Sequence, residues 1–154
     1  MSLPQEASEE PPFWQSPLAT LSREQWEQLC DRCAKCCLHS LEERGSRRVY
    51  FTNVACRLLD LQQCRCRDYP NRSAEVPRCR TLTPELLADP YWLPDSCAYR
   101  RLAEGKPLPE WHPLRSGRAE SVAESGNCVC GRVVGEQQVK PAALKYHLID
   151  WVRC

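Results

Sequence analysis

The sequence has few of the residues that build a large aromatic core or a phosphate-binding loop. Its 154 residues include only two phenylalanines, one methionine and six glycines. A loop that cradles phosphate needs several glycines close together, and no such run is present. Without its 12 cysteines, the apolar residues make up about a third of the chain, enough only for a thin core. Such a chain would gain stability from cross-links or a bound metal.

Long hydrophobic runs are also missing. No stretch approaches the ~18 apolar residues of a membrane-spanning helix. The opening residues, MSLPQEASEEPP, carry acidic residues where a secretory signal has basic ones, and no apolar segment follows them. These features predict a cytoplasmic protein with no membrane partner. Thiols stay reduced in the cytosol, so abundant cysteines there favour metal binding over disulfides.

The chain as a whole lacks a strong charge of either sign. Its formal net charge is +1, so we predict no strong nucleic-acid partner. Residues 44–80 are the exception, with nine arginines against three acidic residues. These arginines either form a solvated surface or donate hydrogen bonds to sulfur atoms. A basic patch that is held together by metal and binds RNA is a further alternative.

Cysteine is what the sequence has in abundance. Cys30, Cys33, Cys36 and Cys37 follow the spacing C-x2-C-x2-C-C. Two intervening residues let a turn bring both sulfurs to one ion, as in zinc and iron–sulfur sites. Because adjacent side chains generally point apart, we do not expect Cys36 and Cys37 to be terminal ligands of one ion. One of them would serve a second metal, bridge two metals or be buried as a plain thiol.

Nine cysteines lie between residues 30 and 97, and we predict that they form the metal site. Two zinc ions, three metals with shared thiolates, or one iron–sulfur cubane would each use some or all of them. A disulfide framework is the competing interpretation, because the total of 12 is even. Cys128, Cys130 and Cys154 have no near partners in this group, and we predict that they are not ligands. The predicted ligands are Cys30, Cys33, Cys36, Cys37, Cys56, Cys64, Cys66, Cys79 and Cys97.

Local patterns predict short elements. Ser22 and Gln25 have the spacing of a capping box, which predicts a helix over 23–30. The other expectations are a strand over 49–52, irregular structure over 53–80, helices after Thr83 and up to Gly105, a loop docked by Trp111, a strand over 128–134 and a helix from Pro141 to Trp151. The predicted fold class is α+β. A small single domain over 13–154 would place short helices and few strands around an irregular cysteine-rich metal-binding centre, after a disordered lead over 1–12.

Several segments resemble the YcgN-like bacterial proteins. They are Phe13-Trp14, LCDRCAKCCLH (29–39), YFTNVACRLLD (50–60), CRCRDYPNR (64–72), WLPDSCAYRRLAEG (92–105), and WHPL with SG (111–117). These proteins belong to the wider CxxCxxCC group, described as zinc- or iron-chelating. The resemblance implies a metal site at the nine cysteines from Cys30 to Cys97. A flagellin lysine methylase with a related cysteine pattern is thought to carry an iron–sulfur cluster. By analogy, the resemblance implies an iron–sulfur cofactor here.

Together these features predict a protein that holds zinc or an iron–sulfur cluster through cysteine thiolates. The sequence does not decide whether the protein is an enzyme. An enzyme that uses an iron–sulfur cluster for redox or group-transfer chemistry is one alternative. A metal-stabilised module that binds a protein or RNA partner is the other.

Overall fold

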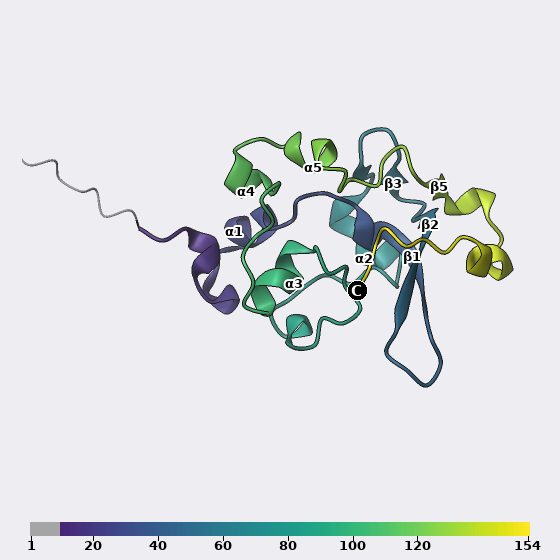
Figure 1. Cartoon of the computed structure of the whole chain (residues 1–154), viewed down its shortest axis with the longest axis horizontal. Helices are drawn as coiled ribbons and strands as arrows, with labels where there is room; N and C mark the ends of the chain where they lie inside the picture. The colour runs from purple at the N-terminus through teal and green to yellow at the C-terminus, as the bar shows by residue number, and fades with distance from the viewer. Residues whose placement is uncertain (1–9) are drawn as a thin grey trace, which may run out of the picture.

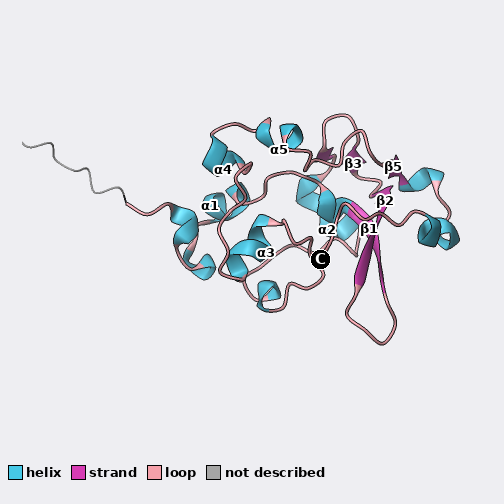
Figure 2. Ribbon diagram, in the orientation of Figure 1, coloured by secondary structure: helices cyan, strands magenta, loops and turns pink. Residues whose placement is uncertain are grey.

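Short helices and turns make up most of residues 10–154, the part of the chain that the computed structural model describes (Figures 1 and 2). The predicted lead over 1–12 lies mostly outside these residues. The α-helices are α1 (Arg23–Gln28), α2 (Arg72–Glu75), α3 (Ala98–Ala103), α4 (Pro113–Ser116) and α5 (Ser121–Glu124). The 3-10 helices are η1 (Phe13–Gln15), η2 (Leu18–Thr20), η3 (Lys35–Cys37), η4 (Tyr69–Asn71), η5 (Leu86–Ala88), η6 (Glu136–Gln138) and η7 (Pro141–Tyr146).

The strands form one small sheet and a separate two-stranded ladder. They are β1 (Leu38–Glu42), β2 (Val49–Ala55), β3 (Leu59–Asp60), β4 (Arg65–Cys66) and β5 (Val134–Gly135). The order in the larger sheet is β1-β2-β5, with β1 antiparallel and β5 parallel to β2, while β3 pairs with β4. Figure 1 shows the β1–β2 hairpin projecting from the body. The prediction of a small α+β domain with more helix than strand is confirmed.

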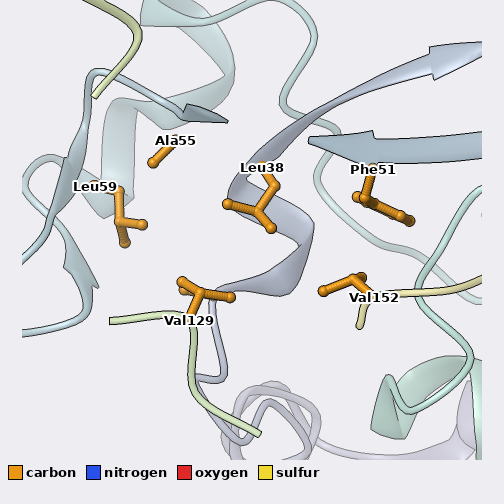
Figure 3. Packing of buried hydrophobic residues seen from close by; sticks show 7 residues of the cluster. Leu38, Phe51, Ala55, Leu59, Val129 and Val152 are labelled. Carbon is orange, nitrogen blue, oxygen red and sulfur yellow. The ribbon is translucent and has the colours of Figure 1, made fainter. Parts of the chain in front are cut away.

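Two hydrophobic clusters hold residues 10–154 together. One gathers Leu29, Leu87, Leu93 and Tyr99 near α1 and α3. The other packs against the sheet and includes Ala34, Leu38, Phe51, Ala55, Leu59, Val129 and Val152, most of which are labelled in Figure 3. Residues 30–37 run from α1 across the body to β1 in Figure 1, so this cysteine-rich loop connects the two clusters. Buried residues at both ends fix where the loop begins and ends.

The helix before the cysteines is capped as predicted. The Ser22 hydroxyl accepts a hydrogen bond from the Gln25 backbone N–H at 3.1 Å, and the Gln25 side chain accepts one from the Ser22 N–H at 3.0 Å. The helix ends at Gln28, two residues earlier than predicted, and Leu29 is fully buried. The Tyr99 hydroxyl donates to the Trp26 carbonyl at 2.7 Å and joins α1 to α3. The capping box therefore sets the start of α1, and tertiary contacts set its end.

Two other predicted elements form, with changed limits. The strand predicted over 49–52 continues to Ala55, because Val54 pairs with Val134 of β5. The helix predicted to end at Gly105 is α3, and Gly105 adopts a left-handed backbone with φ of +75°. A residue with a side chain is strained in that conformation, which explains glycine at this stop.

Several predicted elements are wrong or shorter than expected. Residues 53–80 are not wholly irregular, because they contain the end of β2 together with β3, β4, η4 and α2. The helix after Thr83 is only a 3-10 turn that ends before Pro90, whose ring disfavours helical backbone in the preceding residue. No strand spans 128–134 in this part of the chain, since a turn closed by Arg132 N–H donating to the Val129 carbonyl leaves only β5.

The C-terminal half of the chain differs from the predicted elements in two further places. The segment at 111–114 is not wholly a loop, because Pro113 begins α4 and the fully buried His112 caps that helix. The helix opened by Pro141 is η7, which ends at Tyr146. Beyond it, Ile149 N–H donates to the Phe51 carbonyl at 3.0 Å, so backbone pairing with β2 replaces the last predicted turns. Within residues 10–154, no helix combines the length and the apolar character that crossing a bilayer requires.

Candidate metal centre

The loop over residues 30–37 has an unusual backbone. Arg32 and Ala34 both adopt the left-handed conformation, with φ of 61° and 63°. The Arg32 N–H donates to the sulfur of Cys30 at 3.4 Å, and the Cys33 N–H donates to the Asp31 carboxylate at 3.0 Å. Ala34 leads directly into η3, and a left-handed residue next to a right-handed one turns successive N–H groups toward one point, as in the backbone nests of many iron–sulfur sites. The loop is therefore shaped to surround a negatively charged group.

Cys97 joins this loop from another part of the chain. It precedes α3 and lies near Cys30 and Cys36, so that Cys30, Cys33, Cys36 and Cys97 form one set, here called the Cys97 group. The surrounding protein raises the pKa of the Cys97 thiol to about 12, and the nearby Cys36 adds to the rise. The backbone N–H groups of Arg100 and Tyr99 oppose it. Four thiols from two distant segments thus share one region.

The crowding of these thiols shifts their protonation. Packed protein atoms first, and then Cys36, raise the pKa of Cys30 to about 12. The pKa of Cys33 is raised well above its ordinary value by burial and by Asp31. Cys30 and Cys36 are nevertheless exposed when the whole residue is counted. Without a bound metal, these thiols stay protonated at neutral pH, and binding a metal requires them to release protons.

A second set of thiols lies around Cys79. Burial raises the pKa of Cys79, and the charges of Cys36, Cys56 and Cys66 add to that rise. The Leu58 N–H donates to the Cys56 sulfur at 3.5 Å, and the Cys56 N–H donates to the Cys37 carbonyl at 2.8 Å. The pKa of Cys36 is raised well above its ordinary value, and the neighbouring Cys37 is the largest cause. The adjacent pair therefore lies between the two sets of thiols.

Cys64, Cys128 and Cys130 form a third set, here called the Cys64 triad. Cys64 and Cys130 are joined by a disulfide with 5.8 Å between their Cα atoms, and the sulfur of Cys128 lies 2.9 Å from that of Cys64. The expectation that Cys128 and Cys130 lack near partners is wrong, because the fold brings both of them to Cys64, from which they are separated by 64 and 66 positions in the chain. Cys154 lies elsewhere, exposed and beside Arg100 and Asp95, and burial of its thiol raises its pKa to about 11.

Lys35 connects the three cysteine segments. Its side chain is buried, with 5% of the residue exposed, and its ammonium donates to the Ser96 hydroxyl at 2.8 Å and the Asn127 side-chain oxygen at 2.9 Å. Ser96 precedes Cys97 and Asn127 precedes Cys128. Both partners are neutral, and a buried charge is costly unless an opposite charge lies nearby. Ionised thiolates of the adjacent Cys33 and Cys36 would supply that charge. The sequence did not identify Lys35, because a lysine between cysteines is expected to be a surface residue.

The histidines hold the structure rather than line the thiol groups. His112 is fully buried, and one ring nitrogen contacts the Leu29 carbonyl at 2.8 Å while the other accepts the Leu114 N–H at 3.0 Å. This fixes the backbone immediately before Cys30. His39 contacts the Glu136 carboxylate at 2.5 Å, and burial together with Arg78 lowers the pKa of its ring. Neither histidine was predicted as a ligand, and the position of His112 could not be found from spacing.

The arginines of residues 44–80 mostly contact carbonyl groups, carboxylates and aromatic rings. Arg57 donates to the Glu75 carbonyl at 2.5 Å, and the guanidinium of Arg72 lies 3.8 Å from the centre of the Tyr69 ring. Arg80 lies 5.1 Å from the centre of the Trp92 ring. In the described residues, the hydrogen bonds to sulfur named above come instead from the backbone. Contacts of this kind support the solvated-surface interpretation of these side chains.

Comparison with known proteins identifies the family. Residues 29–98 match the CxxCxxCC family, described as a "Putative zinc- or iron-chelating domain". A UPF0260 protein of Gluconobacter oxydans is 53% identical over 141 residues, covering 91% of this chain and 85% of its own. The chain belongs to the UPF0260 family. A UPF0260 protein of Gluconacetobacter diazotrophicus is 54% identical over 142 residues, covering 92% of this chain and 88% of its own.

The match places the family domain on part of the fold only. It begins at Leu29 and ends at Ala98, so it includes the Cys97 group, the second set of thiols and Cys64, but neither Cys128 nor Cys130. A UPF0260 protein of Shewanella frigidimarina is 51% identical over 129 residues, covering 83% of this chain and 87% of its own. No solved structure matches the chain. The family and the thiol clusters together support metal binding by this protein.

Proposed function

We propose that the protein binds an iron–sulfur cluster through the Cys97 group, with Cys30, Cys33, Cys36 and Cys97 as its four ligands. The observation that carries this proposal is the meeting of the C-x2-C-x2-C loop with a fourth thiol from a distant segment. A cubane cluster needs four cysteine ligands, three of which commonly come from such a loop. The cluster would supply electron transfer or a Lewis-acidic iron, and the chain would supply the thiolates and their surroundings.

The spacing of the sulfurs supports a cluster over a single zinc ion. Zinc–sulfur bonds of about 2.3 Å in a tetrahedron place the four sulfurs about 3.8 Å apart. Within residues 10–154, the only three or more potential ligand atoms that lie within 4.8 Å of one another belong to the Cys64 triad. The sulfurs of the Cys97 group are therefore spread more widely, while still close enough to affect one another's pKa. A cluster with iron at several corners suits this wider spacing.

The surroundings of the Cys97 group suit a negatively charged centre. The backbone N–H of Arg32 donates to a sulfur of the group, and N–H groups near Cys97 favour its thiolate form. The buried ammonium of Lys35 lies in the same loop and has only neutral partners. Hydrogen bonds and positive charge near the sulfurs stabilise a cluster and raise its reduction potential.

The second set of thiols supports an adjacent centre. Cys36, Cys56 and Cys66 lie near Cys79, and Cys37, whose carbonyl accepts the Cys56 N–H, is the neighbour that could complete four ligands. The adjacent cysteines would then each serve a different centre, in keeping with their place between the two sets. Because these thiols come from the residue after β2, from β4 and from the segment after α2, a metal here would tie together separate parts of the fold.

Anaerobic purification with metal analysis and a visible spectrum tests the proposal. A brown protein with absorbance near ~400 nm, iron and acid-labile sulfide is the expected result. A colourless protein with stoichiometric zinc at these cysteines would contradict it. Cys33→Ser and Cys97→Ser should each lower the iron content sharply, whereas Cys154→Ser should leave it unchanged. Equal iron in all three variants would refute the choice of ligands.

A further inference from the structure

The Cys64 triad lies partly outside the family domain and carries chemistry of its own. We propose that Cys64, Cys128 and Cys130 form a separate three-thiolate zinc site, which is filled when the thiols are reduced and emptied when the Cys64–Cys130 disulfide forms. The three sulfurs lie within 4.8 Å of one another, and within residues 10–154 no other set of potential ligands is packed this closely. This spacing is that of thiolates around one ion.

The backbone holds these thiols in place from two directions. Val129, between Cys128 and Cys130, is fully buried and faces Leu38 in the sheet-side cluster (Figure 3). Its N–H donates to the Cys33 carbonyl at 3.1 Å. With Val129 anchored in the core, the residues on either side present their sulfurs to Cys64. Cys64 is itself in the left-handed conformation, with φ of 56°, and its N–H donates to the Asp60 carbonyl at 2.8 Å.

The triad also borders open space. Cys64 and Cys128 line a surface hollow of about 330 Å³ that also reaches Asp31 and Val122. Three protein ligands leave one position on a tetrahedral zinc ion, and this position would face the hollow. Structural zinc sites close all four positions, whereas open sites keep one for water or another ligand. The arrangement is therefore an open site that exchangeable ligands can reach.

The exchange of bound metal for a disulfide is balanced in atoms and electrons once an oxidant is supplied, and it needs no other reactant. In the reduced state, three thiols release three protons and bind Zn²⁺ as thiolates. A low-molecular-weight disulfide then accepts two electrons: the Cys64 thiolate attacks it, forming a mixed disulfide and releasing one thiolate. The Cys130 thiolate attacks the Cys64 sulfur, which forms the Cys64–Cys130 bond and releases the second thiolate. Zinc, left with Cys128 alone, dissociates, and Cys128 takes up a proton.

This inference does not rest on the proposed function, because the two use different cysteines. If only the iron–sulfur proposal fails, the protein is colourless but still loses zinc on oxidation at the triad. If only the present proposal fails, the iron and its absorbance persist and zinc content does not depend on Cys128 or Cys130. Metal content and alkylation of individual thiols distinguish the two cases.

The test uses the full chain, reduced under anaerobic conditions, loaded with Zn²⁺ and freed of excess metal. Wild-type protein should hold one zinc equivalent more than the variant with Cys128→Ser and Cys130→Ser, and the control Cys154→Ser should match wild type. On addition of oxidised glutathione as the low-molecular-weight disulfide, wild type should release that equivalent as the Cys64–Cys130 disulfide appears in a peptide map. Equal zinc in wild type and the double variant would overturn the proposal.

A measurement on wild type alone covers the case in which the double variant does not fold. Zn²⁺ should protect Cys64, Cys128 and Cys130 together from alkylation in reduced protein, while Cys154 stays reactive. Alkylation of these three thiols at the same rate with and without zinc would also overturn the proposal. So would a peptide map in which the Cys64–Cys130 disulfide persists through reduction under native conditions.

Discussion

Lys35 shows how one side chain can connect several functional segments. Its ammonium is buried between neutral partners on the residues that precede Cys97 and Cys128. A neutral residue of similar length in its place leaves the Ser96 hydroxyl and the Asn127 oxygen without their donor. Each unsatisfied buried group costs about 1–3 kcal/mol. The negative charge of the thiolates would lose its nearest buried cation as well.

We therefore expect Lys35→Met to lower both the free energy of unfolding and the metal content. Urea denaturation of the metal-loaded and metal-free protein, with metal analysis of the same samples, measures the two effects separately. Lys140→Met is the matched control, since Lys140 is exposed and should tolerate the change. Wild-type metal content and stability in Lys35→Met would show that this lysine has no part in the centre.

His112 makes a different kind of contribution, through packing and hydrogen bonds alone. Its ring contacts the Leu29 carbonyl and accepts the Leu114 N–H while fully buried. His112→Phe keeps the volume but leaves both backbone groups unpaired, so we expect a loss of about 2–4 kcal/mol in the free energy of unfolding. The measurement is the urea concentration at the midpoint of unfolding, compared between proteins whose dependence of unfolding free energy on urea is the same. His147→Phe should cost less, because His147 is only partly buried, and an equal loss in both variants would contradict this reasoning.

At the scale of elements, α1 matters because it ends just before Cys30. The helix has only six residues, so its capping box is a large part of its stabilisation. Ser22→Ala removes the acceptor for the Gln25 N–H and should lower the free energy of unfolding by about 1 kcal/mol. Ser40→Ala on the exposed side of β1 is the control. If far-UV circular dichroism and urea unfolding showed the same loss for both, the cap would not be stabilising the helix.

The cysteine loop owes its shape to what lies at each of its ends. Leu29 is buried in the cluster near α1 and α3, and Leu38 is buried in the cluster beside the sheet. Between them, the left-handed Arg32 and Ala34 cost conformational energy that the surrounding contacts must offset. The loop can therefore keep its shape only while both clusters are intact, and a metal bound in it would strengthen the connection between them.

At the scale of the whole molecule, the thiols make stability depend on pH. The pKa of Cys30 and of Cys97 is raised from 9.0 to about 12 in the folded protein. Above pH 9 the unfolded chain releases these protons while the folded chain retains them, so the free energy of unfolding falls as the pH rises toward 12. Below pH 9 both states hold the protons, and these thiols give no pH dependence.

We therefore expect metal-free protein to lose stability steadily above pH 9. Metal-loaded protein should lack this loss, because its ligands are already thiolates and bind no proton in the folded state. Urea unfolding at closely spaced pH values, with and without metal, measures the difference. Cys97→Ser should reduce the loss in metal-free protein, and an unchanged slope in that variant would exclude the Cys97 thiol as a source.

Local signals in the sequence determined much of what was predicted correctly. Ser22 and Gln25 defined the start of α1, and residues 49–52 identified β2, because both patterns depend on neighbours in the chain. The C-x2-C-x2-C-C motif indicated a thiolate site for the same reason, since its spacing constrains a single turn of backbone. The thin apolar content correctly predicted short elements around a cysteine-rich centre.

Only the tertiary structure decided which cysteines meet. Cys97 joins the loop at 30–37, and Cys128 and Cys130 join Cys64, through contacts between segments far apart in the chain. The burial of Lys35 and His112 is equally non-local, because each depends on partners more than sixty residues away. Spacing along the sequence sets which sulfurs can share one turn, whereas long-range packing sets which turns share one metal.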